Sequence, residues 1–93
     1  MDWNNRVNKQ FVEALLALRT HDETRRFLRD LLTEGEIEEF ANRLQTASML
    51  TGNVPYSDIT ETTGLSSTTI ARVSKWLHHG MGGYQLVLKR LAH

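Results

Sequence analysis

The sequence contains no cysteine, a single proline and no long apolar run. Without cysteine there can be no disulfide framework, no thiolate zinc site and no cysteine nucleophile. No apolar stretch approaches the ~18–20 residues that a membrane span needs. The first residues, Met1 to Asn5, lack the charged-then-apolar layout of a signal peptide. We therefore expect a cytoplasmic protein of bacterial style, with no membrane partner.

The length of 93 residues predicts one domain over residues 1–93. Hydrophobic residues make up 40% and charged residues 24% of the chain, which is typical of a globular protein and argues against disorder. The scarcity of consecutive β-branched residues argues against an all-β fold. A chain of this length buries only roughly 60–65% of the surface that it exposes when unfolded. We therefore expect a second subunit to cover part of its apolar surface.

The charge is zero overall but unevenly distributed. Residues 1–32 carry six basic and five acidic side chains, and residues 33–61 carry one basic and six acidic ones. Residues 62–93 carry four basic side chains and no acidic one. Four basic residues are close to average usage, so the missing acid is the more informative feature. A segment without acid is where a polyanion can approach, since Lys and Arg make phosphate contacts.

Apolar residues recur with helical spacing along the whole chain, which predicts an all-α fold of about six helices. The expected helices are residues 5–20, a short helix capped by Asp22, 34–51, 58–63, a helix capped by Ser66 or Ser67 and ending near 79, and 83–92.

The helix over 34–51 has the clearest start and stop signals. Thr33 and Glu36 form a capping box, and further glutamates in the first two turns complement the positive helix end. Gly52 suits the left-handed residue that ends a helix, and Pro55 prevents continuation. The predicted apolar stripe is Ile37, Phe40, Ala41, Leu44, Ala47 and Leu50.

Residues 57–79 have the pattern of a helix-turn-helix. Ser57 is expected to cap the first helix, and Gly64 supplies the positive φ of a sharp turn. The apolar positions that such a motif needs are Ile59, Leu65, Ile70, Val73 and Leu77.

The polar residues of this motif are candidates for contacts with double-stranded DNA. Short hydroxyl side chains let a helix N-terminus approach phosphates or base edges, Arg72 can bind a guanine edge or a phosphate, and Lys75 can bind a phosphate. The predicted DNA-binding residues are Ser57, Ser66, Ser67, Thr68, Thr69, Arg72 and Lys75. The alternative is that the hydroxyls only cap helices and the two cations only face solvent.

Three segments resemble a known family. The segments Leu32-Thr33-Glu34-Gly35-Glu36-Ile37-Glu38-Glu39-Phe40-Ala41-Asn42-Arg43, Tyr56-Ser57-Asp58-Ile59 and Thr63-Gly64-Leu65-Ser66-Ser67-Thr68-Thr69-Ile70-Ala71-Arg72-Val73 are similar to the Trp repressor family, and within it to the small YerC/YecD-type regulators. The resemblance extends from about residue 10 to 91. It implies an intertwined homodimer with two reading heads on one palindromic operator.

The resemblance also implies part of a ligand pocket. Thr33, Arg43 and Arg72 match family positions that line the tryptophan site. Val73 stands where the repressor has a glycine, and Trp76 stands where it has a serine. We expect Trp76 or Val73 to fill the cavity, with Arg43 paired to a helix acid and Arg72 on a phosphate. No cofactor is therefore expected, and gating by L-tryptophan is disfavoured.

The remaining signals favour neither a metal site nor an enzyme. His78 and His79 point about 100° apart on a helix and cannot chelate one ion. The glutamates near residue 36 are explained by helix capping. Two functions remain: a homodimeric, sequence-specific DNA-binding regulator, a probable repressor by resemblance, or a protein-interaction module on the same scaffold. The zero net charge supports the second, and a steep salt dependence of DNA binding would distinguish them.

Overall fold

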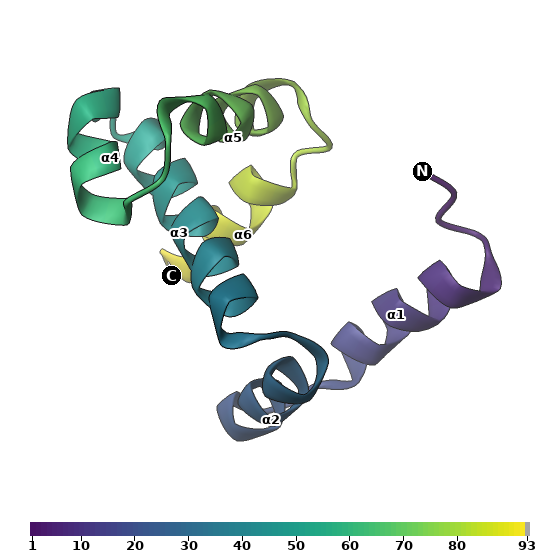
Figure 1. The fold of residues 1–93 in the computed structure, drawn as a ribbon. Helices are drawn as coiled ribbons and strands as arrows, with labels where there is room; N and C mark the ends of the chain where they lie inside the picture. Colours follow the sequence, from purple (N-terminus) through teal and green to yellow (C-terminus); the bar gives the residue numbers. More distant parts are fainter. Residues whose placement is uncertain (93) are drawn as a thin grey trace. The chain divides into compact units, whose positions relative to one another are not determined.

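The computed structural model describes residues 1–92, which form six α-helices and no strand (Figure 1). The all-α prediction is therefore confirmed. The helices are α1 (Arg6–Ala17), α2 (His21–Leu31), α3 (Glu34–Thr51), α4 (Tyr56–Thr63), α5 (Ser67–His79) and α6 (Gly83–Leu91). None of them is long and apolar enough to cross a membrane. The chain forms two compact units, Met1–Ile37 and Glu38–His93. The single domain over residues 1–93 stays a prediction.

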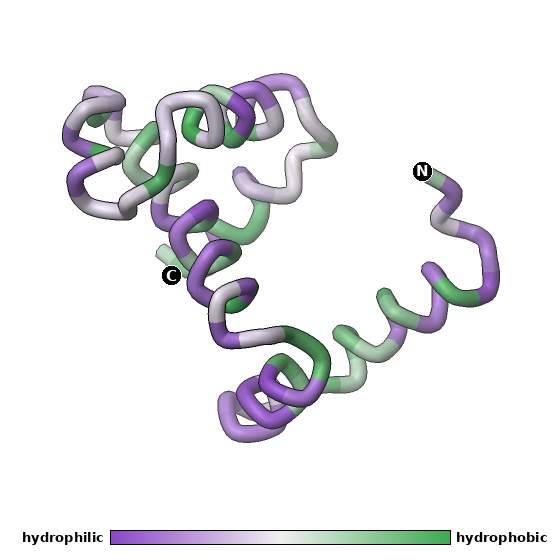
Figure 2. The backbone as a smooth tube through the Cα atoms, in the orientation of Figure 1, coloured by the Kyte–Doolittle hydropathy of each residue, from purple (hydrophilic) through white to green (hydrophobic). Residues whose placement is uncertain are grey.

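Helix α1 begins after Asn5, whose side chain accepts a hydrogen bond from the Asn8 N–H. The helix ends at Ala17, three residues before the predicted end at residue 20. None of its side chains is buried, and even large apolar ones are exposed: Val7 is 73% exposed, Phe11 47% and Leu16 79%. Figure 2 shows the hydrophobic residues that run along this helix.

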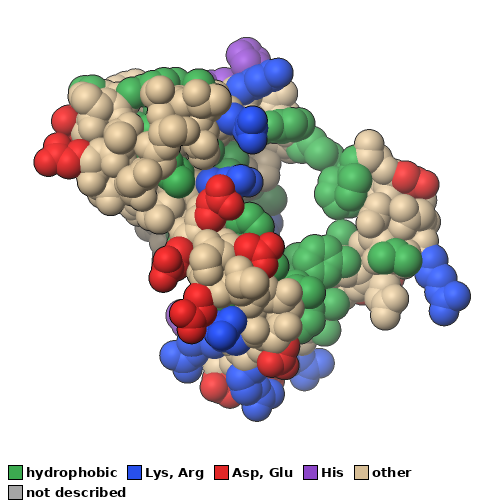
Figure 3. Space-filling model, viewed as in Figure 1, with side chains coloured by type: hydrophobic (Ala, Val, Ile, Leu, Met, Phe, Trp, Pro, Cys, Tyr) green, Lys and Arg blue, Asp and Glu red, His purple; other side chains and the backbone are tan. Residues whose placement is uncertain are grey.

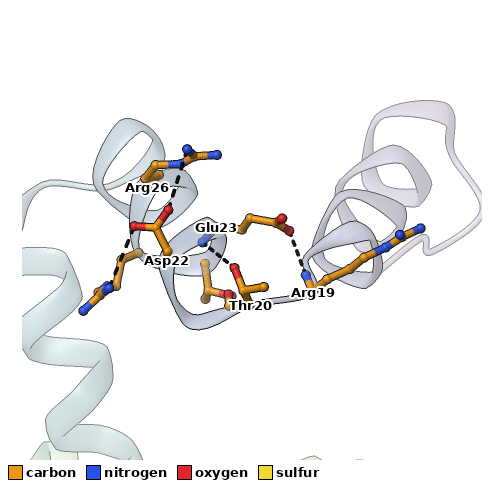
Figure 4. Close-up of polar contacts among 7 residues, drawn as sticks. Arg19, Thr20, Asp22, Glu23 and Arg26 are labelled. Atoms are coloured by element: carbon orange, nitrogen blue, oxygen red, sulfur yellow. Dashed lines mark hydrogen bonds and ion pairs between the residues drawn. The ribbon is translucent and has the colours of Figure 1, made fainter.

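The N-cap of helix α2 lies two residues earlier than the sequence suggested. Thr20, not Asp22, is the N-cap, and its hydroxyl accepts the Glu23 N–H at 3.1 Å (Figure 4). The Glu23 carboxylate in turn accepts the Arg19 N–H at 3.0 Å. This pair of contacts occupies the helix start, so the prediction of an Asp22 cap is wrong. Asp22 lies in the first turn and pairs with Arg25 and with Arg26.

The core of the second unit lies where α3, α5 and α6 meet. Ala47, Val73 and Leu77 are buried together, and Leu50, Tyr84 and Leu88 pack against them. Ile59 of α4 and Ile70 of α5 are fully buried as well. The predicted apolar positions of α4 and α5 are thus confirmed, with Leu65 half-buried between them.

The predicted stripe of α3 is only partly covered. Ala47 is buried and Leu44 and Leu50 are half-buried, but Phe40 and Ala41 are exposed. The buried core of this unit reaches α3 only near its C-terminal end, at Ala47 and the adjacent Thr46. Thr46 is tolerated there because its hydroxyl donates to the Asn42 carbonyl at 2.8 Å.

The turn after α3 differs from the prediction in two details. Asn53, with a φ of 58°, takes the left-handed conformation that was expected of Gly52. Asparagine tolerates this region, and the turn is closed by the Val54 N–H, which donates to the Met49 carbonyl at 3.1 Å. Pro55, not Ser57, precedes α4, which starts at Tyr56. Because the proline ring has no side-chain acceptor, α4 starts without a side-chain cap, although the φ of Pro55 is already near the helical value.

The turn between α4 and α5 depends on Gly64, whose φ is 74°. A Cβ at this position would meet no atom within 4 Å, so any penalty for a side chain is conformational.

We expect Gly64→Ala to lower the free energy of unfolding by about 1–2 kcal/mol, measured by urea denaturation. The control is Gly35→Ala in the first turn of α3, where φ is not positive and an alanine is expected to stabilise by roughly 0.5–1 kcal/mol. Equal effects of the two substitutions would contradict this account.

Candidate nucleic-acid interface

Helices α4 and α5 form the helix-turn-helix that the sequence predicts over residues 57–79, with its start at Tyr56. The turn is held by Thr63, whose buried hydroxyl donates to the Ile59 carbonyl at 2.8 Å and accepts the Leu65 N–H at 3.2 Å. Of the two predicted caps, Ser66 is the one used: its Oγ accepts the Thr69 N–H at 3.2 Å. These contacts set where α5 begins.

Core packing sets the rotation of α5 about its own axis. Ile70, Val73 and Leu77 are the buried residues of this helix. At about 100° per residue, Thr68, Arg72, Lys75 and His79 lie on the opposite side of the helix. All four are exposed, and together they form one outward stripe along α5. In Figure 3, Lys, Arg and His side chains gather on the visible surface where α5 ends.

The seven predicted DNA-binding residues do not have equivalent environments. Ser67, Thr68, Arg72 and Lys75 are exposed on α5, whereas Thr69 is half-buried. The Ser66 hydroxyl donates to Thr69 Oγ1 at 3.1 Å, so these two side chains are engaged in the helix cap. Ser57 lies in the first turn of α4 and is exposed. The structure thus places a cap at residues 66 and 69 and a free polar face at the other α5 positions.

The two cations of the stripe have no acidic partner. Within residues 1–92, neither Arg72 nor Lys75 forms an ion pair, whereas Arg25, Arg26, Arg29 and Arg43 each do. Helices α5 and α6 contain no Asp or Glu. Arg72 and Lys75 could therefore bind an anionic ligand without breaking an internal ion pair.

Thr33, the first of the residues matched to the ligand pocket, is engaged in the predicted capping box. Its N–H donates to the Glu36 carboxylate at 3.0 Å, and its hydroxyl accepts the Glu36 N–H at 3.1 Å. The backbone hydrogen bond and, to a lesser extent, the side chain of Thr33 lower the pKa of Glu36. The capping box is thereby confirmed, and it stabilises the start of α3.

Arg43 confirms the expectation that it pairs with a nearby helix acid. Its guanidinium lies 3.3 Å from the Glu39 carboxylate and 5.6 Å from the centre of the Phe40 ring. Its Nε is buried and has no hydrogen-bond partner among the described residues. Arg43 is thus held against its own helix.

The two residues that depart from the family pattern behave differently. Val73, which stands where the repressor has a glycine, is 3% exposed and belongs to the core. Trp76 is 56% exposed, so of the two residues expected to fill the cavity Val73 is the one that is buried within the chain. Trp76 lies on the flank of α5, about 90° from the centre of the face formed by the buried residues. No element of its own unit covers it from outside.

Trp76 instead lines an open apolar groove of about 470 Å³. The other lining residues come from α3, the loop after α5, and α6: Leu44, Met81, Gly83, Tyr84 and Val87. Gly80 lies against the Trp76 ring, because a Cβ there would lie 2.9 Å from that ring. Sequence reasoning did not find this groove. The available signal was a glycine four residues after a tryptophan, followed by an apolar helix.

Helix α6 is attached to α5 by one further contact. The Gln85 amide donates to the Leu77 carbonyl at 2.9 Å, which satisfies a carbonyl near the end of α5. Among the described residues, no group of three or more His, Asp or Glu side chains could hold a metal ion.

The exposed side of α5 presents cations and hydroxyls, which are groups that can bind an anionic ligand.

Comparisons with known proteins agree with this description. A family model described as Trp repressor protein matches residues 7–92. The uncharacterized protein YerC of Bacillus subtilis is 38% identical over 82 residues, which are 88% of this chain and 79% of that protein.

Two solved structures are similar over nearly the whole chain. A TrpR-like protein from Eubacterium eligens has 37% identity and a TM-score of 0.92, over 97% of this chain and 93% of its own. A protein from Staphylococcus aureus, described as a candidate Trp repressor, has 30% identity and a TM-score of 0.91, over 99% and 95%.

Proposed function

Because the chain belongs to the Trp repressor family, we propose that it is a sequence-specific DNA-binding regulator of transcription, acting in the bacterial cytoplasm as a homodimeric repressor. The observation that carries this proposal is the exposed stripe of α5, which holds Arg72 and Lys75 directly opposite the buried face. Its mechanism is occupancy of a promoter site, without catalysis. No residue cluster of the described chain requires an enzymatic role.

The proposed contacts follow from the chemistry of the α5 surface. Ser67 and Thr68 stand at the helix N-terminus, where N–H groups and the helix dipole favour phosphate. Arg72 can bind a guanine edge or a phosphate, and Lys75 binds a phosphate. In a two-fold symmetric dimer, two such helices would bind half-sites about 34–36 Å apart on a palindromic operator.

The apolar surface of α1 supports a homodimer. At about 100° per residue, its apolar positions spread over roughly half of the helix circumference, wider than the stripe of a helix that packs on a single core. Val7, Phe11 and Leu15 lie on one side of this arc, and Val12 and Leu16 extend it. All five are at least 39% exposed within the chain. A second copy can cover this surface, as the family resemblance implies.

Tryptophan is not proposed as a ligand. Val73 fills core space where the repressor has a glycine, and the bulky Trp76 replaces a serine. Arg43 is already paired with Glu39, and Thr33 with Glu36. Regulation by tryptophan or another small molecule is the alternative that the family favours. An interaction module that binds protein and not DNA is the alternative that the zero net charge favours.

We expect the wild-type protein to bind a mixed-sequence DNA duplex with a steep salt dependence, measured by fluorescence anisotropy at several salt concentrations. The double variant Arg72→Ala, Lys75→Ala should bind more weakly. Its salt slope should be smaller by about 0.9 for each phosphate contact that is lost. The control Lys89→Ala, Arg90→Ala makes the same charge change on α6 and should lose less. Absence of binding by the wild type at low salt would favour the interaction module.

We expect the protein to sediment as a homodimer, with a mass of about twice 10.7 kDa in analytical ultracentrifugation. Phe11→Glu should shift it toward monomer, because a charge would be placed in a desolvated interface. Gln10→Glu adds the same charge to α1 outside the apolar arc and should leave the dimer intact. A monomeric wild type, or a dimer insensitive to Phe11→Glu, would refute the proposed role of α1.

We expect no micromolar binding of L-tryptophan in isothermal titration calorimetry, because Val73 stands where the repressor's glycine leaves room and because Arg43 and Thr33 already have internal partners. Added L-tryptophan should also leave DNA affinity unchanged in the anisotropy assay. Micromolar heat together with a rise in DNA affinity would establish the tryptophan-gated alternative.

A further inference from the structure

His79 continues the cationic stripe of α5. Thr68, Arg72, Lys75 and His79 follow one another at intervals of four, three and four residues, so they lie within roughly 60° of one another on the helix. The eleven-residue interval extends the stripe to about 16 Å at 1.5 Å per residue. All four are exposed, and they lie on the side of α5 that is opposite Ile70, Val73 and Leu77.

The surroundings of His79 leave its imidazole available. Within residues 1–92 its imidazole takes part in no hydrogen bond and no ion pair. Its ring centre lies 6.4 Å from that of His78, which points about 100° away around the helix. The charged and titratable groups of the neighbouring elements are Glu34, Glu36, Glu38, Glu39 and Arg43 on α3; Tyr56, Asp58 and Glu61 on α4; and Tyr84, Lys89 and Arg90 on α6. None of them contacts His79 by an ion pair.

A DNA-bound α5 would place this histidine near the backbone. The recognition helix of a helix-turn-helix contacts base edges with its N-terminal residues, so positions farther along the same stripe approach the rim of the groove. Phosphates line that rim. An imidazolium there contributes a positive charge and an N–H donor, whereas a neutral imidazole contributes no charge.

We propose that His79 is a phosphate contact of α5 that operates when protonated, so that DNA affinity increases as the pH falls from 8 to 6. This inference rests on the proposed DNA-binding function. Histidine changes its charge between about pH 5 and 8. Phosphate favours the charged form, so DNA binding is coupled to proton uptake, and a lower pH strengthens binding.

A simpler role for the same residue is to stabilise the end of α5. His78 and His79 both lie in the last turn, where positive charge complements the helix dipole. The two residues share that position but only His79 lies on the outward stripe. His78 is therefore a matched control, because an effect through helix stability would occur in both.

The test is the DNA affinity of the full chain on a fixed duplex at pH 6, 7 and 8 and constant ionic strength, by fluorescence anisotropy. For the wild type we expect, for each helix bound, that binding tightens by about threefold from pH 8 to pH 6 and that the salt slope steepens by about 0.9. His79→Gln should keep the weaker affinity at every pH. His79→Lys should keep the tighter one, and His78→Gln should behave as the wild type. Thermal unfolding of each variant checks the fold.

The outcomes separate this inference from the proposed function. Steeply salt-dependent binding that does not change with pH would overturn the role of His79 and leave the DNA-binding function intact. Retention of the pH dependence in His79→Gln would also overturn it, since His21, His78 and His93 remain in that variant. Absence of DNA binding at every pH would refute both.

Discussion

The packing of α5 against the end of α3 and against α6 is the constraint on which the rest of the functional surface depends. Val73 and Leu77 are buried with Ala47, and Ile70 of α5 and Ile59 of α4 are fully buried as well. Because three buried residues on one side fix the rotation of a helix, the opposite side is fixed as well. The exposed positions of Thr68, Arg72, Lys75 and His79 are thus a consequence of core packing. These exposed side chains therefore need no packing contacts of their own to be held on the outer side of α5.

The small core leaves much apolar surface uncovered, and this surface differs between the two units. The Met1–Ile37 unit buries no side chain of α1 or α2, while the Glu38–His93 unit has a core but also an open groove beside Trp76. Large apolar surface on a short chain is stabilised by association. The proposed homodimer is therefore supported by the exposed apolar surface of this chain as well as by the family resemblance.

The helix starts show where local signals compete. Thr20 and Asp22 are both residue types that suit an N-cap. Thr20 is the cap in the structure, and the Glu23 carboxylate adds a second hydrogen bond at the same helix start by accepting the Arg19 N–H. Pro55 starts α4 without a side-chain cap, which leaves Ser57 inside the helix. Such choices depend on energies of about 1 kcal/mol, so composition near a boundary does not settle them.

Periodicity and turn chemistry by themselves determined the six helices, the capping box at Thr33, the positive φ at Gly64 and the apolar spacing along α5, because each depends on neighbours within a few residues. Only the tertiary structure decided which apolar residues are covered. Phe40 and Trp76 read as core positions, yet both are exposed because no other part of their own unit packs over them. Burial depends on segments distant in sequence, and helical spacing carries no information about them.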